Sequence, residues 1–261
     1  MSTRFYSPIV RWFIAAAAAT AVVAPASGRA AVNLTPTADA LVSAAHPTLN
    51  YGAADRLAVA APQQVNGEFQ SLLKFDTSAA KASFDAQFGA GQWRLDGFLT
   101  LFYTTKNDPL FNNPVASNIY IDWLPNDSWT EGTGTAASPA VGGGAGGVTY
   151  NDVAALSSGF ENLIPGGWGG APDTGGASQL TSSSTHPGFA ADVMAGNIVT
   201  LRLRYFDASS SVIPKSREFA SQTPLWSMSA TALPEPRGAV ILAAAATATA
   251  AGRRRRRAAQ P

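Results

Sequence analysis

Hydrophobic and polar positions alternate along several stretches of this chain, and the alternation predicts β-strands. Residues 197–207 show it best. The apolar positions of this run are Val199, Leu201, Leu203 and Tyr205, and the polar ones are Thr200, Arg202 and Arg204. A period of two is that of a strand with one buried face. We therefore expect a half-buried strand here.

Further runs behave similarly at 71–76, 93–105, 118–125 and 224–230. Leu95, Leu99, Leu101 and Tyr103 are expected to share one face, as are Ile119, Ile121 and Trp123. Polar turn formers separate the runs. Many short strands joined by turns predict an all-β fold, an antiparallel jelly-roll-like β-sandwich. A helical pattern over 76–91 predicts one or two turns within a loop.

Glycine is concentrated in the middle of the chain. Of the 24 glycines, 15 lie between Gly132 and Gly188. This composition predicts long Gly-rich loops inserted between strands rather than a second domain. The chain has 261 residues, 46% of them hydrophobic, and no cysteine. Its core alone, or its core with a metal ion, must therefore hold the fold.

The N-terminus has the pattern of a secretory signal peptide. Arg4 and Arg11 form a positive region before an apolar run over 12–23, and small residues follow at 24–26 and 28–30. This order predicts export and cleavage by signal peptidase, with residues 1–30 as the signal peptide and 31–232 as the domain. The alternative is a membrane anchor that stays in place, although the apolar run is short for a span.

The C-terminus combines three elements. The first is the triplet Pro234, Glu235 and Pro236, the second is an Ala-rich apolar run at 238–251, and the third is a cluster of five arginines. These arginines are Arg253, Arg254, Arg255, Arg256 and Arg257. The positive-inside rule keeps such a cluster on the cytoplasmic side, so the tail predicts transient anchoring in the inner membrane. A disordered basic end that binds nucleic acid is the alternative.

In their order and position, these elements resemble the PEP-CTERM sorting signal of bacteria that make extracellular polysaccharide. The resemblance covers 233–257 and leaves 258–261 as a short tail. It implies recognition by an exosortase, a membrane transpeptidase-like enzyme, with processing near the Pro-Glu-Pro triplet. It also implies a final place at the cell surface or in the extracellular matrix.

The net charge of the central stretch differs from the +1 of the whole chain, because the two targeting segments are basic. All 17 acidic residues lie in 31–236, together with nine of the 18 Lys and Arg, so this stretch carries a net charge of −8. A surface this acidic excludes nucleic acid as a partner. It would also repel polyanionic glycans unless cations bridge the two.

Five stretches occur in an order that resembles the DNRLRE-type module. They are TADALVSAAHPTLNYGAADRLAVAA at 37–61, SLLKFDTS at 71–78, DSWTEGTGT at 127–135, GVTYND at 147–152 and IPKSREFASQTPLWSMSA at 213–230. The resemblance implies a jelly-roll β-sandwich akin to carbohydrate-binding modules. Such modules occur on extracellular bacterial proteins and on some polysaccharide lyases. The Gly-rich stretch between Tyr150 and Asn197 departs from the pattern.

Motifs of known enzymes are missing from the sequence. The two histidines, His46 and His186, each precede a proline, and neither lies near a nucleophile motif. Asp127 and Glu131 flank Trp129 in the manner of turn and hydrogen-bonding residues, although paired carboxylates can also cleave glycosides. We therefore expect no enzymatic activity, with a polysaccharide-degrading enzyme as a minor alternative.

Two carboxylates are candidates for a cation site. Asp39 is expected at the start of the first strand and Glu218 just before the last one, so a sandwich can bring them together at one edge. A hard cation such as Ca²⁺ needs several oxygen ligands of this kind. The alternative is that Glu218 pairs with Arg217 or another arginine, while Asp39 caps a turn. Ca²⁺ is the only cofactor that the sequence suggests.

Aromatic side chains in loops are candidates for stacking on sugar rings. Trp168 stands out because PGGWGG offers no strand to bury it locally, so it either stacks on sugar or covers the sandwich. Tyr51 and Tyr150 are lesser candidates for glycan contact or serve as turn anchors. Trp93 and Trp123 are predicted to lie in the core, and Trp129 is predicted to be structural.

Together these features predict an exported, non-enzymatic surface or matrix protein that associates with extracellular polysaccharide. The alternative is a purely structural biofilm scaffold without glycan binding.

Overall fold

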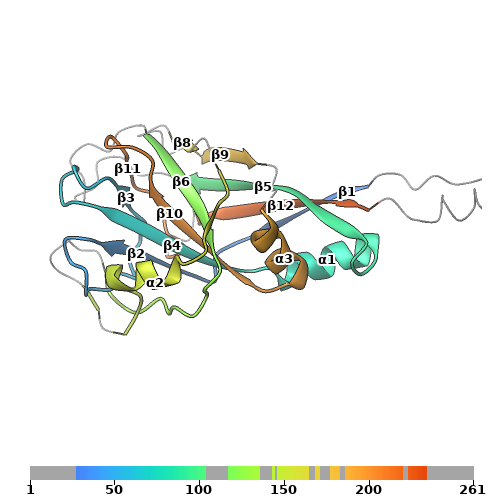
Figure 1. The fold of residues 1–261 in the computed structure, drawn as a ribbon, viewed down its shortest axis with the longest axis horizontal. Helices are drawn as coiled ribbons and strands as arrows, with labels where there is room; N and C mark the ends of the chain where they lie inside the picture. The colour runs from blue at the N-terminus through green and yellow to red at the C-terminus, as the bar shows by residue number, and fades with distance from the viewer. Residues whose placement is uncertain are drawn as a thin grey trace, which may run out of the picture.

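Two antiparallel β-sheets form the framework of the described chain and share one apolar core (Figure 1). The computed structural model describes residues 28–103, 117–135, 143–144, 146–164, 168–170, 177–182, 186–219 and 223–233. Of these, 97–103, 117, 168–170 and 177–182 are described by their backbone alone.

The smaller sheet has four strands. Their order across the sheet is β1 (Arg29–Leu34), β12 (Leu225–Ala232), β5 (Trp93–Tyr103) and β9 (Ala177–Ser182). The pairing of β12 with β5 shifts register between Ser229 and Ala230. This irregularity lies opposite the stretch from Leu95 to Gly97 and interrupts the strict alternation that the sequence predicts for β5.

The larger sheet has eight strands. Six of them lie in the order β11 (Ser211–Val212), β3 (Val59–Ala60), β4 (Phe69–Asp76), β10 (Ile198–Tyr205), β6 (Ser117–Leu124) and β7 (Glu161–Asn162). In addition, β2 (Ala38–Ser43) pairs with β4, and β8 (Trp168–Gly170) pairs with β6. All these pairings are antiparallel, which confirms the predicted all-β antiparallel sandwich.

The main core lies between the sheets and follows the predicted alternation. Its members from β10, β6 and β12 are Val199, Leu201, Leu203, Ile119, Ile121, Trp123, Trp226, Met228 and Ala230. Burying each large apolar side chain contributes about 1.5–3 kcal/mol, so these strands hold the fold without disulfides.

The other face of β10 departs from the prediction, because it is buried as well. Thr200 is 0% exposed and Arg202 is 7% exposed. A second apolar cluster covers the neighbouring part of this face, with residues from η1 (Tyr150–Asp152), α2 (Val153–Leu156) and the segment after β6. The half-buried assignment is therefore wrong: β10 is a central strand with both faces covered.

Two helices lie side by side at one end of the sandwich (Figure 1). In α1 (Ser78–Phe88), Ala80 and Phe84 are buried, and the Phe84 ring lies 5.0 Å from that of Trp93. In α3 (Pro187–Ala195), Phe189 and Val193 are buried. The prediction of one or two turns at 76–91 is wrong, since α1 spans 11 residues. A helix of this length is marginal in water by itself, so packing on the core stabilises it.

The Gly-rich middle of the chain is also more regular than predicted. Between Gly132 and Gly188 the described residues include η1, α2, β7, β8 and β9. Trp168, expected in a loop, begins β8 and pairs with Ile119 of β6. The prediction of long loops is therefore wrong from η1 onward, whereas the described residues between β6 and η1 form no helix or strand.

Both ends of the described domain leave from the same side. Arg29 at the start of β1 pairs with Thr231 near the end of β12, and Figure 1 shows both strands reaching the end that carries α1 and α3. Most of the predicted signal peptide, at 1–27, and the sorting motif with its arginine cluster, at 234–261, lie outside the described residues. None of the helices in the described part of the chain has the length and apolar character of a membrane span.

Candidate functional site

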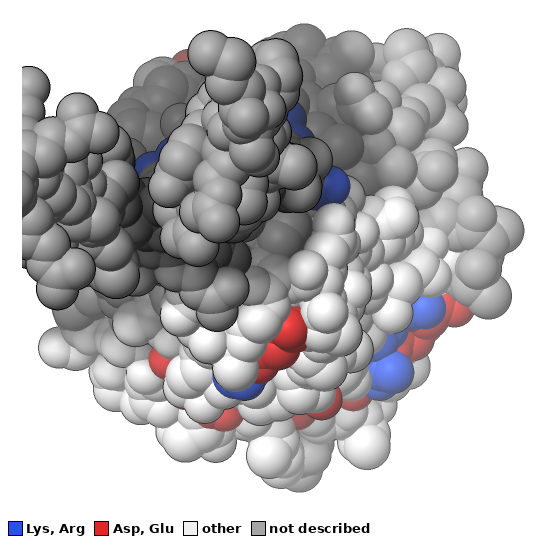
Figure 2. Space-filling model, turned by 90° about the vertical axis from the view of Figure 1, so that its right-hand side faces the viewer, with Lys and Arg blue, Asp and Glu red and all other residues white. Residues whose placement is uncertain are grey.

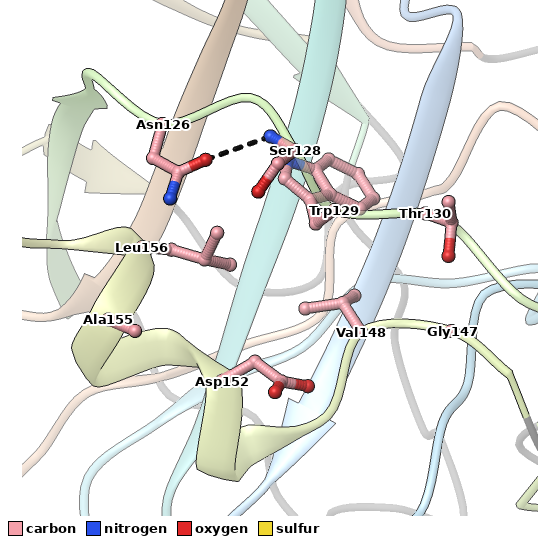
Figure 3. Close-up of a pocket in the computed structure, with 9 residues that line it drawn as sticks. All are labelled: Asn126, Ser128, Trp129, Thr130, Gly147, Val148, Asp152, Ala155 and Leu156. Carbon is pink, nitrogen blue, oxygen red and sulfur yellow. Dashed lines mark hydrogen bonds between the residues drawn. The ribbon is translucent and has the colours of Figure 1, made fainter.

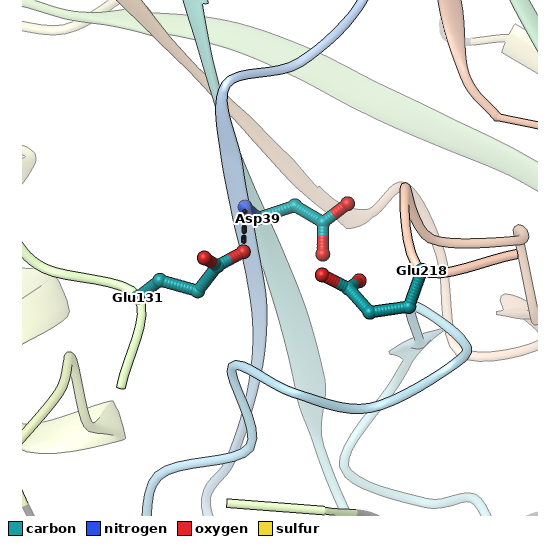
Figure 4. A group of neighbouring side chains, drawn as sticks. All are labelled: Asp39, Glu131 and Glu218. Carbon is teal, nitrogen blue, oxygen red and sulfur yellow. Dashed lines mark hydrogen bonds between the residues drawn. The ribbon is translucent and has the colours of Figure 1, made fainter. Parts of the chain in front are cut away.

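Three carboxylates from distant parts of the sequence meet beside β2 (Figure 4). Asp39 is the second residue of β2, Glu131 lies after β6, and Glu218 lies between β11 and β12. One oxygen from each carboxylate lies within 4.8 Å of the others. In Figure 4 the Asp39 side chain points toward Glu218, while the Glu131 carboxylate reaches the backbone of β2.

Arg217 ties this group together. Its guanidinium donates two hydrogen bonds to Glu131, from Nε at 2.9 Å and from Nη2 at 2.5 Å. The same Nη2 lies 3.2 Å from an oxygen of Glu218. The backbone N–H of Arg217 donates to Asp39 Oδ2 at 2.7 Å, and the N–H of Asp39 donates to Glu131 Oε1 at 2.8 Å. The Arg217 guanidinium therefore contacts two of the three carboxylates, and one cation beside three carboxylates leaves an excess of negative charge.

Burial shifts the titration of Asp39. The side chain is buried, and desolvation raises its pKa from 3.8 to about 8. The hydrogen bond from the Arg217 backbone opposes this rise, while the charges of Glu218 and Glu131 add to it. Without a further cation, Asp39 holds a proton at neutral pH. A divalent cation beside it would displace that proton and offset the excess negative charge.

The carboxylate group contains one contact from each of the alternatives that the sequence left open. Asp39 and Glu218 do meet, and Glu218 also pairs with Arg217. Glu131 was interpreted as a turn and hydrogen-bonding residue, and its place in this group was missed. Its position in the Trp-x-Glu-Gly stretch is a signal in the sequence that Glu131 matters, but the spacing does not show that this stretch returns to β2.

A second charged group lies on the outer face of the larger sheet. Asp122 of β6 is 0% exposed and accepts hydrogen bonds from two arginines of β10. Arg202 donates from Nη2 at 2.6 Å and Nε at 3.0 Å, and Arg204 donates from Nε at 2.6 Å. Here two guanidiniums serve one carboxylate, so the charge excess is positive.

Aromatic rings flank these arginines. The Arg202 guanidinium lies 4.9 Å from the centroid of the Phe160 ring, and Arg204 lies 4.1 Å from that of Tyr120. Phe160 is 43% exposed, so its ring offers a surface on which the C–H face of a sugar can stack. The sequence pattern did not predict this place, because period-two alternation puts Arg202 and Arg204 only on the polar face of a strand.

A pocket of ≈ 290 Å³ opens between the segment after β6 and the η1–α2 segment (Figure 3). Its apolar lining residues are Trp129, Val148, Ala155 and Leu156, and its polar ones are Asn126, Ser128, Thr130 and Asp152. Trp129 is buried, and its Nε1 donates to Thr200 Oγ1 at 2.9 Å. Lys74 Nζ lies 4.5 Å from the centroid of its ring. These contacts agree with the predicted structural role of Trp129.

Comparison with known proteins agrees with this architecture. Residues 30–145 match the family model of carbohydrate-binding module family 96. The match runs from β1 past β6 and includes Asp39 and Glu131, although it covers less than half of the chain. The domain is thus similar to a carbohydrate-binding module, which agrees with a non-catalytic binding role. No curated protein matches the chain.

The predicted glycan contacts fall in different places on this carbohydrate-binding-like domain. Tyr51 is 1% exposed within a small apolar cluster, so its ring lies in the interior rather than on a binding surface. Tyr150 is half-buried, and desolvation together with a hydrogen bond to Glu68 raises its pKa to about 12. The backbone of Trp168 lies in β8. Trp93 and Trp123 are buried in the core, as predicted.

Proposed function

We propose that this protein associates with extracellular polysaccharide without cleaving it. The observation that carries the proposal is the match of residues 30–145 to a carbohydrate-binding module family. The exposed Phe160 ring, which lies beside two arginines, adds a surface suited to sugar stacking.

The carboxylates do not favour a glycosidase. Hydrolysis needs two carboxyl groups on either side of a bound sugar, about 5–9.5 Å apart. Asp39 is buried, and Glu131 is held by Arg217 and by the backbone of β2. Neither group is therefore placed to attack or protonate a polymer.

We further propose that Asp39, Glu131 and Glu218 hold Ca²⁺. Three carboxylates beside a single guanidinium supply the oxygen ligands and negative charge that a hard cation prefers. A bound cation would fix the segment after β6 and the one before β12 to β2. It would also reduce the repulsion that this acidic domain exerts on anionic glycans.

Export and sorting complete the proposal. The pattern at 1–30 supports cleavage by signal peptidase, and the pattern at 233–257 supports sorting by an exosortase to the cell surface or matrix. Since β1 and β12 pair as neighbours, both segments join the domain at one end. Figure 2 views this end, where acidic and basic side chains of the described residues are mixed. Transient membrane contact is proposed for the C-terminal span alone.

A polysaccharide depletion assay on the purified protein tests the binding proposal. Neutral and anionic polymers are mixed with the protein, with Ca²⁺ or with chelator, and the unbound fraction is measured. We expect depletion by at least one polymer and a weaker effect for Phe160→Ala. Val65→Ala, at another exposed apolar position, is the control and should bind normally. Trp168→Ala tests the earlier candidate in the same assay.

The opposite result is equally informative. If no polymer depletes the folded protein, with or without Ca²⁺, the polysaccharide proposal fails. A sorted structural scaffold would then be the better account of this sandwich.

A further inference from the structure

We infer that the pocket between residues 126–130 and the η1–α2 segment binds one ring of a neutral sugar, at a chain end or a branch of the polymer. This inference rests on the proposed polysaccharide association and assigns it a site. The pocket lies apart from the carboxylate group and from Phe160, because the lining residues include neither.

The size of the pocket limits its occupant. Sites for drug-sized ligands usually span about 300–1,000 Å³. At ≈ 290 Å³ this pocket is at the lower limit, so it suits a single ring better than several consecutive rings. A polymer would therefore place a chain end or a side branch in the pocket, and its backbone would not lie along the pocket.

The lining has the mixed character of a sugar site. Trp129, Val148 and Leu156 form an apolar wall from one buried cluster. Such a wall complements the C–H face of a pyranose ring. Polar residues flank Trp129 in the lining, and the Ser128 and Thr130 side chains are exposed for hydroxyl contacts.

Charge decides the class of sugar. Asp152 is the single charged side chain among the described residues that line the pocket. Its Oδ2 accepts hydrogen bonds from Thr149 N and Oγ1, both at 2.8 Å, which fixes the carboxylate at the rim. Lys74, whose Nζ lies 4.5 Å from the centroid of the Trp129 ring, is engaged with the carbonyls of Asp127 and Trp129. A uronate would meet a like charge here, whereas a neutral sugar would find a hydroxyl acceptor.

The pocket is also well placed for a polymer. Figure 1 shows α2 on the side of the domain away from the end where β1 and β12 meet the flanking segments. A ligand at α2 therefore does not compete for space with either segment.

Two adjacent alanines of α2 allow a matched test. Ala155 lines the pocket, whereas Ala154 does not, and both are exposed. Ala155→Trp fills the pocket without disturbing the core, and Ala154→Trp adds the same indole outside it. Binding of a panel of neutral and uronic oligosaccharides is measured by titration calorimetry. We expect Ala155→Trp to weaken neutral-sugar binding at least about tenfold, equivalent to 1.4 kcal/mol. Ala154→Trp should bind like the unmodified protein.

The possible results separate the site from the function. If folded Ala155→Trp binds neutral sugars normally, the assignment of this pocket as the sugar site is overturned, while the proposed polysaccharide association stands. Binding of uronic sugars alone overturns the neutral class. Binding of no sugar by the unmodified protein overturns the proposed function and this inference together. Ser128→Tyr, which blocks the opposite rim, replaces Ala155→Trp if that variant melts below the control.

Discussion

Two buried aspartates of the larger sheet have opposite charge balances. Asp122, on β6, is 0% exposed and accepts hydrogen bonds from both Arg202 and Arg204. Asp39, on β2, is 1% exposed and lies next to two glutamates, and the guanidinium of Arg217 is bonded to those glutamates. The first carboxylate therefore has two cationic partners, while the second has a backbone N–H and two like charges.

This difference separates a structural role from a candidate binding role. A buried carboxylate with two guanidiniums is compensated within the chain and needs no further partner. A buried carboxylate within an acidic group is compensated only by a proton or by an external cation. Burial by itself therefore says little about function, whereas the local balance of charge distinguishes the two sites.

The largest expected effect comes from removing the compensated carboxylate. Asp122→Asn leaves Arg202 and Arg204 without an anionic partner, and Arg202 is buried. Removing one partner of a buried ion pair costs about 3–5 kcal/mol of unfolding free energy. Urea unfolding measures this loss. Asp55→Asn, in an exposed pair with Arg56, is the control and should change stability by less than about 0.5 kcal/mol. Equal losses for both variants would contradict the comparison.

A smaller effect of opposite sign is expected at Asp39. Its pKa is raised from 3.8 to about 8 in the folded chain, so the folded state retains a proton that the unfolded chain releases. The stabilisation is complete below about pH 4 and is lost as the pH rises toward about 8. Asp39→Asn stays neutral and lacks this loss. Relative to the unmodified protein, the variant should therefore gain stability as the pH rises across that range.

Urea unfolding at a series of pH values, with chelator present, measures this difference. A constant difference between the two proteins from pH 4 to pH 8 would show that Asp39 titrates normally. The interpretation of its environment would then be wrong. Asp122→Asn, which also replaces a buried carboxylate of the larger sheet, is measured in the same series as the comparison.

The smallest expected effect is stabilisation by Ca²⁺. At a concentration ten times its dissociation constant, a bound ion adds about 1.4 kcal/mol. For a domain of this size, each kcal/mol raises Tm by about 2–4 °C. The rise should be larger at pH 8 than at pH 6, since Ca²⁺ must displace the proton of Asp39. Asp39→Asn and Glu218→Gln should abolish it, and chelator should reverse it.

Thermal unfolding monitored by circular dichroism, with Mg²⁺ in parallel, is the measurement. An unchanged Tm at millimolar Ca²⁺ and pH 8 would remove the proposed cation site. The polysaccharide proposal would be unaffected by that outcome, because it does not depend on the metal.

Local patterns in the sequence were enough to predict the fold class. The alternation of Val199, Leu201 and Leu203 places them in the core, because side chains of a strand point to opposite faces in turn. The same rule failed for Thr200 and Arg202, which are buried as well. Periodicity describes one strand, whereas burial of its second face depends on segments from elsewhere in the chain. Helix α1 was underestimated for a similar reason, since α3, which packs beside it, lies far along the chain.

The candidate sites show the same division. The sequence by itself determined the strand pattern, the acidic balance of the central domain and the pairing of Asp39 with Glu218 as a hypothesis. Only the tertiary structure brought Glu131 into that group, exposed Phe160 beside two arginines and formed the pocket against α2. The physical reason is distance along the chain. Hydrophobic burial depends on residue type and on the spacing of apolar residues, and both can be read within a single segment. A site depends on how separate segments meet in space.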